Sequence, residues 1–217
     1  MTVVFAHVDP AHARDAFHWH RGFAAANDML FPRSWAEYEN LANDGRIVCA
    51  TEDGLYLGLC YYTWDDSEEE WEVGGLMVDS RQRKRSLGSI LTRVTLGHLL
   101  FEEEPLSRHE RIISHVHRQN DAPRRLVEDQ LGFTFVREIT VESARVPGLP
   151  VEADGLVHGD LFQLAHPYTV ELLALWCESW EGKLRDKTPA EIELFEGVTV
   201  QLWGQAFRRM AEDPIGL

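Results

Sequence analysis

The chain has 217 residues, of which 44% are hydrophobic, and its 36 acidic residues outnumber its 21 basic ones to give a formal charge of −15 at pH 7. This content can bury one substantial core with a compact extension, whereas the acidic balance argues against nucleic acid as the main partner. No apolar run approaches the ~18 residues of a membrane span and no signal peptide is evident, so we expect a soluble, cytoplasmic protein that does not contact membranes.

Cysteine and histidine usage predicts no metal centre. Cys49, Cys60 and Cys177 are too few and too scattered for a disulfide framework or a C-x-x-C zinc site, so we interpret them as reduced core residues. His115 and His117 alternate on a predicted strand and point to one side, but no third ligand occurs at a diagnostic spacing. Packing or substrate contact is therefore the favoured interpretation of this pair.

The N-terminal region is predicted to form a strand and two helices. Residues 3–6 form the strand and residues 10–27 the first helix. The second helix begins after Ser34, because Ser34 and Glu37 have the spacing of a capping box, and Gly45 ends it.

A β-hairpin follows. Residues 46–52 and 56–64 read as strands on either side of Asp53-Gly54, which is a strong hairpin-turn signal. The acidic run at residues 65–70 is interpreted as a solvated turn in preference to a rim that attracts substrate.

The stretch from Trp71 to Phe101 predicts a central strand, a basic turn and a helix. Residues 71–78 are apolar, and the Gly74-Gly75 pair favours a bulge or a local splay of the strand. The helix starts near Ser86, and its apolar residues recur at helical spacing. Helix N-termini have free N–H groups and partial positive charge, so this order of elements predicts an anion site.

Basic residues gather at this turn although the chain as a whole is acidic. No acidic residue occurs between Ser80 and Phe101. We therefore favour a phosphate site over a solvated basic loop. The five basic residues of the stretch are Arg81, Arg83, Lys84, Arg85 and Arg93.

The later elements are predicted from the same patterns. Residues 111–117 form a strand and residues 120–130 a helix. Residues 133–141 and 157–165 form two further strands, which we expect to pair with each other.

Residues 83–88, Arg-Lys-Arg-Ser-Leu-Gly, resemble the Q/R-x-x-G-x-G/A signature of the GNAT superfamily of acetyl-CoA-dependent N-acetyltransferases, which lies between a strand and a helix. Ser86 stands where the family has its first motif glycine. Asn120 opens a helix that ends in Leu131-Gly132-Phe133, similar to the family's second cofactor segment with a spacing about one residue longer. The resemblance covers residues 2–166.

The resemblance implies an α/β fold of the α+β type, in which helices flank a mixed, mostly antiparallel central sheet. Residues 1–166 would form the acyltransferase domain, and residues 167–217 a C-terminal helical extension. Residues 169–180 and 189–210 read as amphipathic helices, the second with capping signals at residues 188–191. Packing on the main core is favoured over a homodimer contact or a lid.

The resemblance also implies acetyl-CoA as cosubstrate. Its pantetheine would follow the central strand, its pyrophosphate would lie on the backbone amides of residues 83–89, and Arg81, Arg85 or Arg124 would meet its 3′-phosphate. Backbone N–H groups near the end of the strand would hold the reaction's oxyanion. The cofactor-binding residues so implied are Leu76, Met77, Val78, Arg83, Lys84, Arg85, Ser86, Leu87, Gly88, Ser89 and Asn120.

Acyl transfer to an amine needs a general base, because an alkylamine with a pKa of about 10 is charged at neutral pH. Glu72 lies six residues before Val78, where histone acetyltransferases of the superfamily carry their base glutamate. By strand parity it would share a face with Leu76 and Val78, and apolar neighbours would raise its pKa. An ordinary strand-entry glutamate is an equally good interpretation, and Glu70 is the second candidate.

Val127 or one of its neighbours stands where many members of the family carry a tyrosine general acid. The departing thiolate, whose conjugate thiol has a pKa of about 8.5, needs little help to leave. The chain offers other proton donors that the sequence does not rank. They are Tyr61, Tyr62, His115, His117 and Tyr168.

The sequence thus predicts an N-acetyltransferase that moves acetyl from acetyl-CoA to a primary amine of a small molecule or peptide, by direct attack in a ternary complex. The acidic surface outside the basic stretch favours a cationic amine, with aromatic contacts from Trp19, Phe23, Trp35 and Tyr38. Two alternatives are a CoA-binding regulatory module with weakened catalysis and an interaction protein that uses its helical tail.

Overall fold

The computed structural model describes residues 3–27, 29–82, 86–102, 111–164, 166–178, 192–194, 197–198 and 200–212. Three of the residues expected to bind the cofactor, Arg83, Lys84 and Arg85, lie outside this part of the chain, as do the predicted capping residues 188–191.

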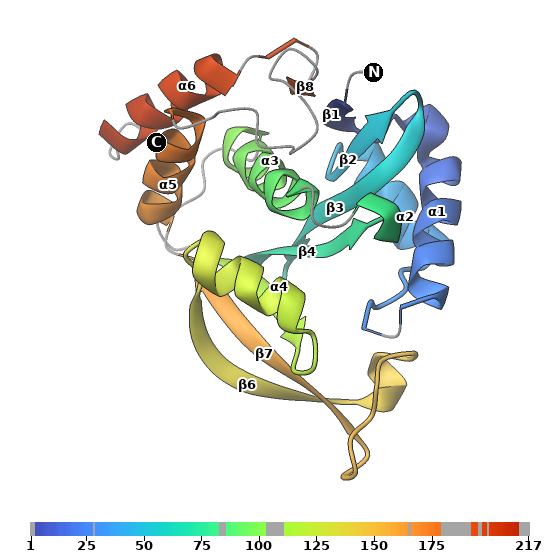
Figure 1. The fold of residues 1–217 in the computed structure, drawn as a ribbon. Coiled ribbons are helices and arrows are strands. Elements are labelled where there is room, and N and C mark those ends of the chain that lie inside the picture. Colours follow the sequence, from blue (N-terminus) through green and yellow to red (C-terminus); the bar gives the residue numbers. More distant parts are fainter. Residues whose placement is uncertain are drawn as a thin grey trace.

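Eight described strands form one sheet in the order β6-β7-β5-β4-β3-β2-β1-β8 (Figure 1). The described pairs are antiparallel except for β4 with β5 and β1 with β8. The sheet is therefore mixed and mostly antiparallel, as predicted. The strands are β1 (Val3–His7), β2 (Ile47–Glu52), β3 (Leu55–Asp65), β4 (Glu70–Val78), β5 (Arg111–His117), β6 (Thr134–Glu142), β7 (Leu156–Leu164) and β8 (Ile192–Leu194).

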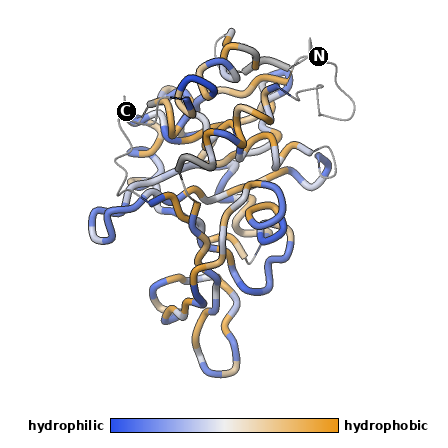
Figure 2. Tube along the Cα trace, turned by 90° about the vertical axis from the view of Figure 1, so that its left-hand side faces the viewer, coloured by the Kyte–Doolittle hydropathy of each residue, from blue (hydrophilic) through white to orange (hydrophobic). Residues whose placement is uncertain are grey.

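Helices cover both faces of the sheet (Figure 1). The α1 and α2 helices share one buried cluster with β2 and β3, while α3, α5 and α6 belong to a second, larger cluster on the opposite face. Figure 2 shows many hydrophobic segments in the body of the molecule, while the loops that project at its lower end carry both hydrophobic and hydrophilic residues. The helices are α1 (Ala13–Ala25), α2 (Trp35–Asn43), α3 (Leu87–Glu102), α4 (Asp121–Arg125), α5 (His166–Glu178) and α6 (Val200–Glu212).

Local signals in the N-terminal half are confirmed. The Ser34 hydroxyl accepts from the Glu37 N–H at 3.3 Å, and the Glu37 carboxylate accepts from the Ser34 N–H at 2.8 Å, which completes the capping box. Asp53 and Gly54 have φ values of 51° and 77°. Two successive positive φ values match the strand twist of a tight hairpin, so β2 and β3 pair around this turn.

A bulge in β4 decides which of its side chains share a face. Leu59 of β3 opposes Met77 and Tyr61 opposes Gly74, so β4 holds one residue more than β3 between these two pairs. Gly75 lies in the bulge with φ 62°, and a Cβ there would collide with the Tyr61 ring. Glycine is therefore required at this position.

The bulge corrects one prediction. Glu72 pairs with Thr63, which puts it on the α1/α2 face with Tyr61. Beyond the bulge, Leu76 and Val78 pack against the cluster of the α3 face instead. The expectation that Glu72 shares a face with Leu76 and Val78 is wrong, because one extra residue inverts the alternation of a strand.

The C-terminal region departs from the two predicted helices. The α5 helix is present, but residues 192–194 form β8, which adds to β1 in parallel, and α6 begins only at Val200. Gly197 separates them with φ 85°. A single helix over residues 189–210 is therefore wrong, because the edge of β1 forms backbone pairs with residues 192–194 that the helix would have used internally.

The cysteines and the described helices agree with the composition. Cys49, Cys60 and Cys177 are buried free thiols, as predicted. Within the described helices, none combines the length and the apolar character needed to cross a bilayer.

Candidate active site

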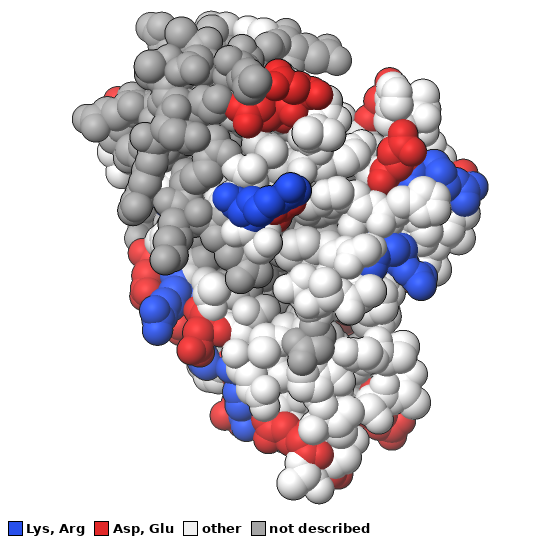
Figure 3. All heavy atoms as spheres, turned by 45° about the vertical axis from the view of Figure 1, so that its right-hand side comes forward, with Lys and Arg blue, Asp and Glu red and all other residues white. Residues whose placement is uncertain are grey.

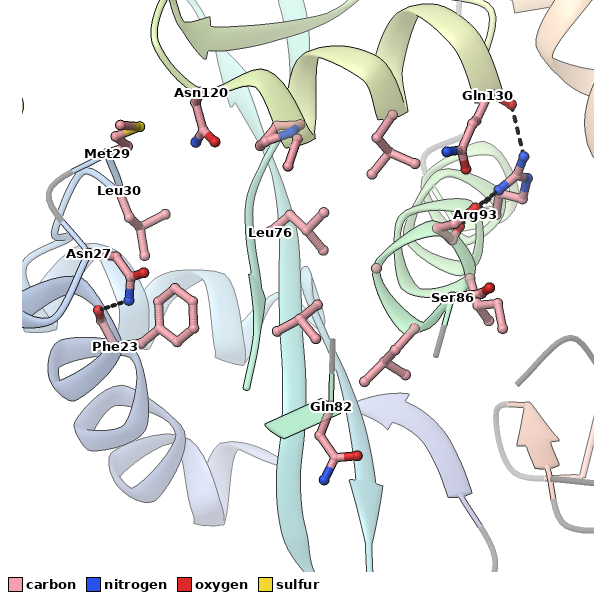
Figure 4. A pocket seen from close by; sticks show the side chains of 18 of the residues that line it. Phe23, Asn27, Met29, Leu30, Leu76, Gln82, Ser86, Arg93, Asn120 and Gln130 are labelled. Carbon is pink, nitrogen blue, oxygen red and sulfur yellow. Dashed lines mark hydrogen bonds between the residues drawn. The ribbon is translucent and has the colours of Figure 1, made fainter. Parts of the chain in front are cut away.

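A cavity of about 890 Å³ lies between β4, the start of α3, α4 and the connection from α1 to α2 (Figure 4). Leu76 from β4 lies centrally, Phe23 and Leu30 come from the α1/α2 side, and Asn120 and Gln130 from the α4 side. Arg93 is the one charged residue among the described residues that line it. A cavity of this size suits a small molecule, and its charge favours an anionic one.

Most of the residues expected to bind the cofactor lie together at this cavity. Among the expected residues that the structure describes, Met77 is the exception, because its side chain is fully buried on the α1/α2 face. The residues of that set that line the cavity are Leu76, Val78, Ser86, Leu87, Gly88, Ser89 and Asn120.

Ser86 has an unusual backbone conformation at the start of α3. Its φ is 64°, in the left-handed region that glycine adopts without cost. Its carbonyl accepts the first helical hydrogen bond, from Ile90 N–H at 3.1 Å, so the amides of residues 87–89 have no partner within the helix. The chain thus uses serine where the turn geometry favours glycine, and N–H groups without a helical partner lie at the cavity.

The second segment contains a π-helical turn. Leu126–Gln130 continues α4 with this wider winding, and the Leu131 N–H donates to the Leu126 carbonyl at 3.1 Å. A π-turn accommodates one extra residue in a helix, which explains the longer spacing seen in the sequence. Val127 is buried in the core and Leu126 lines the cavity. Both side chains are hydrocarbon, so neither can act as the general acid.

Glu72 occupies the point where β4 and β5 separate. The two strands pair only from Glu70 with Arg111 to Glu72 with Ile113. His115, two residues further along β5, places its Nδ1 3.1 Å from Glu72 Oε1. The side chain of His115 is 40% exposed and that of Glu72 is 28% exposed, so a partner molecule could reach this pair.

The pKa values of the two groups shift in opposite directions, because each group stabilises the charged form of the other. Burial by itself raises the pKa of Glu72, but the hydrogen bond and charge of His115, with the charge of Arg33, outweigh it and lower this pKa overall. Burial lowers the pKa of His115, and the hydrogen bond and charge of Glu72 outweigh it and raise this pKa overall. The expectation of a raised pKa for Glu72 is wrong, because β5 places a basic partner beside it.

Arg33 is a neighbour of this pair that sequence analysis missed. Its guanidinium lies 4.6 Å from the centre of the Tyr61 ring and 3.8 Å from Glu37. Its Nε is buried without an acceptor among the described residues. A pattern on one helix or strand does not reveal such a residue, because it comes from the segment between α1 and α2 and meets β3 only in the fold.

The other candidates are less well placed. Glu70, the second candidate for the general base, forms an ion pair with Arg111 at 2.7 Å. Tyr62 is buried among the aromatic residues of the α3 face, and the His117 ring nitrogens contact the Pro150 carbonyl and the Gln119 N–H. The side chain of Tyr168 lies outside the described part of the structure.

The aromatic residues expected near the acceptor occupy different environments. Phe23 lines the cavity and stacks on Trp19, with ring centres 5.5 Å apart. The Arg14 guanidinium lies 3.9 Å from the centre of the Trp35 ring. Tyr38 is fully buried, so its predicted contact with an acceptor is wrong. Among the described residues there is also no group of three or more side chains placed to hold a metal ion.

The chain folds as an α/β protein with a cavity suited to an anionic ligand, and comparison with known proteins gives the family. The model of the acetyltransferase (GNAT) family matches residues 13–133, more than half of the chain. The chain belongs to this family. A comparison with the sequences of curated proteins finds no match.

Solved structures share the fold at low sequence identity. A GNAT acetyltransferase from Streptococcus pneumoniae is 16% identical, with TM-score 0.59, over 75% of this chain and 98% of that one. YncA, a putative acetyltransferase from Salmonella typhimurium solved with acetyl-CoA, is 18% identical, with TM-score 0.56, over 76% and 94%. Diaminobutyrate acetyltransferase EctA from Paenibacillus lautus, solved with diaminobutyric acid and coenzyme A, is 19% identical, with TM-score 0.55, over 76% and 96%.

Proposed function

We propose that the protein is an N-acetyltransferase that transfers acetyl from acetyl-CoA to a primary amine of a small molecule or peptide in a ternary complex. The observation that carries this proposal is the Glu72–His115 pair at the point where β4 and β5 separate, in a chain of the GNAT family. The cavity between β4, α3 and α4 supplies room for the coenzyme.

The cavity suits an anionic coenzyme. In the proposal, the backbone amides of residues 87–89 receive the pyrophosphate and Leu76 and Val78 contact the pantetheine, while Asn120 contributes from the opposite wall. Arg83, Lys84 and Arg85 complete this set as a proposal from the sequence. Supporting the assignment, the solved relatives YncA and EctA hold acetyl-CoA and coenzyme A, respectively.

In the proposed reaction, the amine nitrogen attacks the thioester carbonyl carbon, a C–N bond forms, and the C–S bond breaks to release the coenzyme as a thiolate. One proton leaves the ammonium before the attack, and a second leaves the nitrogen as the amide forms. The thiolate can take up one of them, and the other passes to solvent through the Glu72–His115 pair. N–H groups of the strand near Met77 and Val78 would hold the oxyanion.

Glu72 and His115 divide the role of base in this proposal. Glu72 carries the negative charge and keeps His115 Nδ1 protonated across their 3.1 Å contact. The second ring nitrogen of the neutral imidazole, Nε2, then receives the proton from the amine. This arrangement uses an imidazole with a raised pKa as the base, whereas Glu72 has a lowered pKa and by itself would be a weak base.

The acceptor is proposed to be cationic. Figure 3 shows acidic and basic side chains interspersed over one face instead of a continuous acidic surface. Attraction of a cation would therefore depend on Asp65 and Glu72 near the strand divergence, since Arg111 already pairs with Glu70. EctA was solved with a diamino acid, which fits an acceptor of this class.

We further propose that residues 1–166 form the acyltransferase unit and residues 167–217 an extension of it, with a homodimer contact as one use of that extension. The extent of the structural likeness supports this division, since the three relatives cover about three quarters of the chain. The three free thiols support a cytoplasmic location.

Calorimetric binding of acetyl-CoA, followed by thiol release with a panel of amines, tests the proposal. An N-acetyltransferase binds the coenzyme and releases thiol in the presence of a particular amine. Binding without release from any amine would favour the regulatory module. Absence of binding would favour the interaction protein.

A further inference from the structure

One wall of the cavity comes from outside the part of the chain matched by the family model. Trp176 lies on α5, well beyond residue 133, and its side chain is 8% exposed. It lines both the main cavity and an adjoining one of about 230 Å³. Val170, Leu173 and Ala174 of the same helix are buried in the cluster that includes α3, so packing of α5 fixes the position of this ring.

Arg93 stands beside this ring. Its guanidinium carbon lies 5.8 Å from the centre of the Trp176 ring. It donates to the Gln130 carbonyl at 2.8 Å and to the Ser89 carbonyl at 3.2 Å, and it also contacts the Ser89 hydroxyl. All three acceptors are neutral, and among the described residues no carboxylate forms an ion pair with Arg93. Arginine keeps its charge at neutral pH, so this half-buried cation has no counter-charge among the residues that the structure describes.

Two other described arginines near the proposed coenzyme site, Arg81 and Arg124, differ in this respect. Arg81 is bound by Asp79 at 2.7 Å, and Arg124 by Asp160 at 3.0 Å. Their charges are already neutralised, although the sequence suggested both for the 3′-phosphate. A cation removed from water without an anionic partner is unfavourable, and a phosphate at Arg93 would offset that cost.

The geometry points to the kind of ligand that this wall receives. Arg93 lies four residues beyond Ser89 on α3, a rise of about 6 Å from the first turn where the pyrophosphate is expected. An aromatic ring beside an uncompensated cation suits a purine ring that carries a phosphate. Pantetheine supplies neither group, so the nucleotide end of the coenzyme fits this wall and the pantetheine end does not.

We propose that Trp176 and Arg93 form the subsite for the 3′-phosphoadenosine end of the coenzyme, with Trp176 against the adenine ring and Arg93 on the 3′-phosphate. The inference rests on the proposed function. It gives the C-terminal extension a direct part in coenzyme binding, because α5 completes a cleft that the family-matched residues leave open on this side.

Calorimetry with fragments of the coenzyme tests the subsite. Adenosine 3′,5′-bisphosphate carries the nucleotide end, 4′-phosphopantetheine carries the other end, and dephospho-CoA lacks the 3′-phosphate. Trp176→Leu should weaken binding of CoA and of adenosine 3′,5′-bisphosphate by roughly 10- to 100-fold, the range of base–aromatic stacking, and leave 4′-phosphopantetheine binding unchanged. Arg93→Gln should abolish the preference of the protein for CoA over dephospho-CoA.

Two control variants match these changes. Trp203 is 6% exposed and packs against Phe101 and Phe207 on α3 and α6, away from the residues that line the cavity. Arg118 pairs with Glu138 on β6. Trp203→Phe and Arg118→Gln should bind every fragment as the wild type does.

The outcomes separate the subsite from the function. If the wild type binds CoA but folded Trp176→Leu and Arg93→Gln bind all fragments normally, the subsite is wrong and the proposed function stands. If the wild type binds no CoA, the proposed function fails first. If Trp176→Leu does not fold, Trp176→Phe replaces it. Adenosine 3′,5′-bisphosphate should then quench tryptophan fluorescence in the wild type and in Trp203→Phe, and persistence of the quench in Trp176→Phe would overturn the proposal.

Discussion

His115 Nδ1 lies 3.1 Å from Glu72 Oε1, and Glu72 is the last residue of β4 that pairs with β5. The contact joins neighbouring parallel strands at the point where they diverge. It exists because β5 continues past the paired segment and its alternation places His115 over the Glu72 carboxylate. The protonation of each group therefore depends on the other.

The first prediction concerns the pH dependence of turnover. Glu72 raises the pKa of His115, so kcat/KM should rise with pH through a value above the ordinary histidine pKa of about 6.5. In Glu72→Gln the inflection should move down, because burial by itself lowers the pKa of His115, and kcat/KM should fall by roughly 10²- to 10⁴-fold. Glu68→Gln, in the exposed turn, is the control. An inflection that stays in place in Glu72→Gln would show that this pair is not the base.

The second prediction concerns stability. The lowered pKa of Glu72 contributes stability above its unfolded value of about 4.5, which is lost as pH falls through the folded value. The raised pKa of His115 contributes stability below about 6.5, which is lost as pH rises through the folded value. The difference in Tm between wild type and Glu72→Gln should therefore be largest between about pH 4.5 and 6.5. A difference that is constant from pH 4 to 9 would contradict the ion pair.

The third prediction concerns Ser86. Its φ of 64° is left-handed, so Ser86→Gly should raise the free energy of unfolding by up to about 1 kcal/mol and leave CoA binding intact or tighter. Asp53→Gly, at φ 51° in the distant hairpin turn, is a matched control that should stabilise without affecting CoA. A loss of roughly 1.5 to 3 kcal/mol in CoA binding would instead identify the serine hydroxyl as a phosphate ligand.

The fourth prediction concerns Gly88. It lines the cavity, and a Cβ there would lie 3.5 Å from both Leu76 and Val78. An alanine should therefore fit, whereas Gly88→Trp should fill the start of the cleft and abolish CoA binding in calorimetry. Gly22→Trp is the control, because a Cβ at Gly22 meets nothing within 4 Å. Unchanged binding in Gly88→Trp would mean that the coenzyme does not use this loop.

The fifth prediction concerns the acceptor. If carboxylates near the strand divergence attract a cationic amine, its KM should increase with salt, because screening weakens the attraction. Polyamines, aminoglycosides, amino acids and peptide N-termini should be compared at two ionic strengths. A neutral or anionic best acceptor, or a KM that does not change with salt, would remove electrostatics from substrate choice.

Much of the fold could be predicted because its signals are local. Ser34 and Glu37 meet across one helical turn, and Asp53-Gly54 closes a two-residue turn, so a few neighbouring residues determine each geometry. The order of β4 and α3, and the glycine pair that bulges β4, are visible for the same reason. The extra residue after Asn120 was also visible, although its accommodation in a π-turn was not.

The sequence by itself determined the family, the order of most elements and most of the expected residues that line the cavity, since motif spacing and hydrophobic periodicity are properties of neighbouring residues. Only the tertiary structure decided which face Glu72 occupies, that His115 is its partner, that residues 192–194 join β1, and that Trp176 reaches the cavity. Each of these depends on contacts between residues far apart in the chain. Strand register, a one-residue bulge and helix packing set such contacts, and no local pattern encodes them.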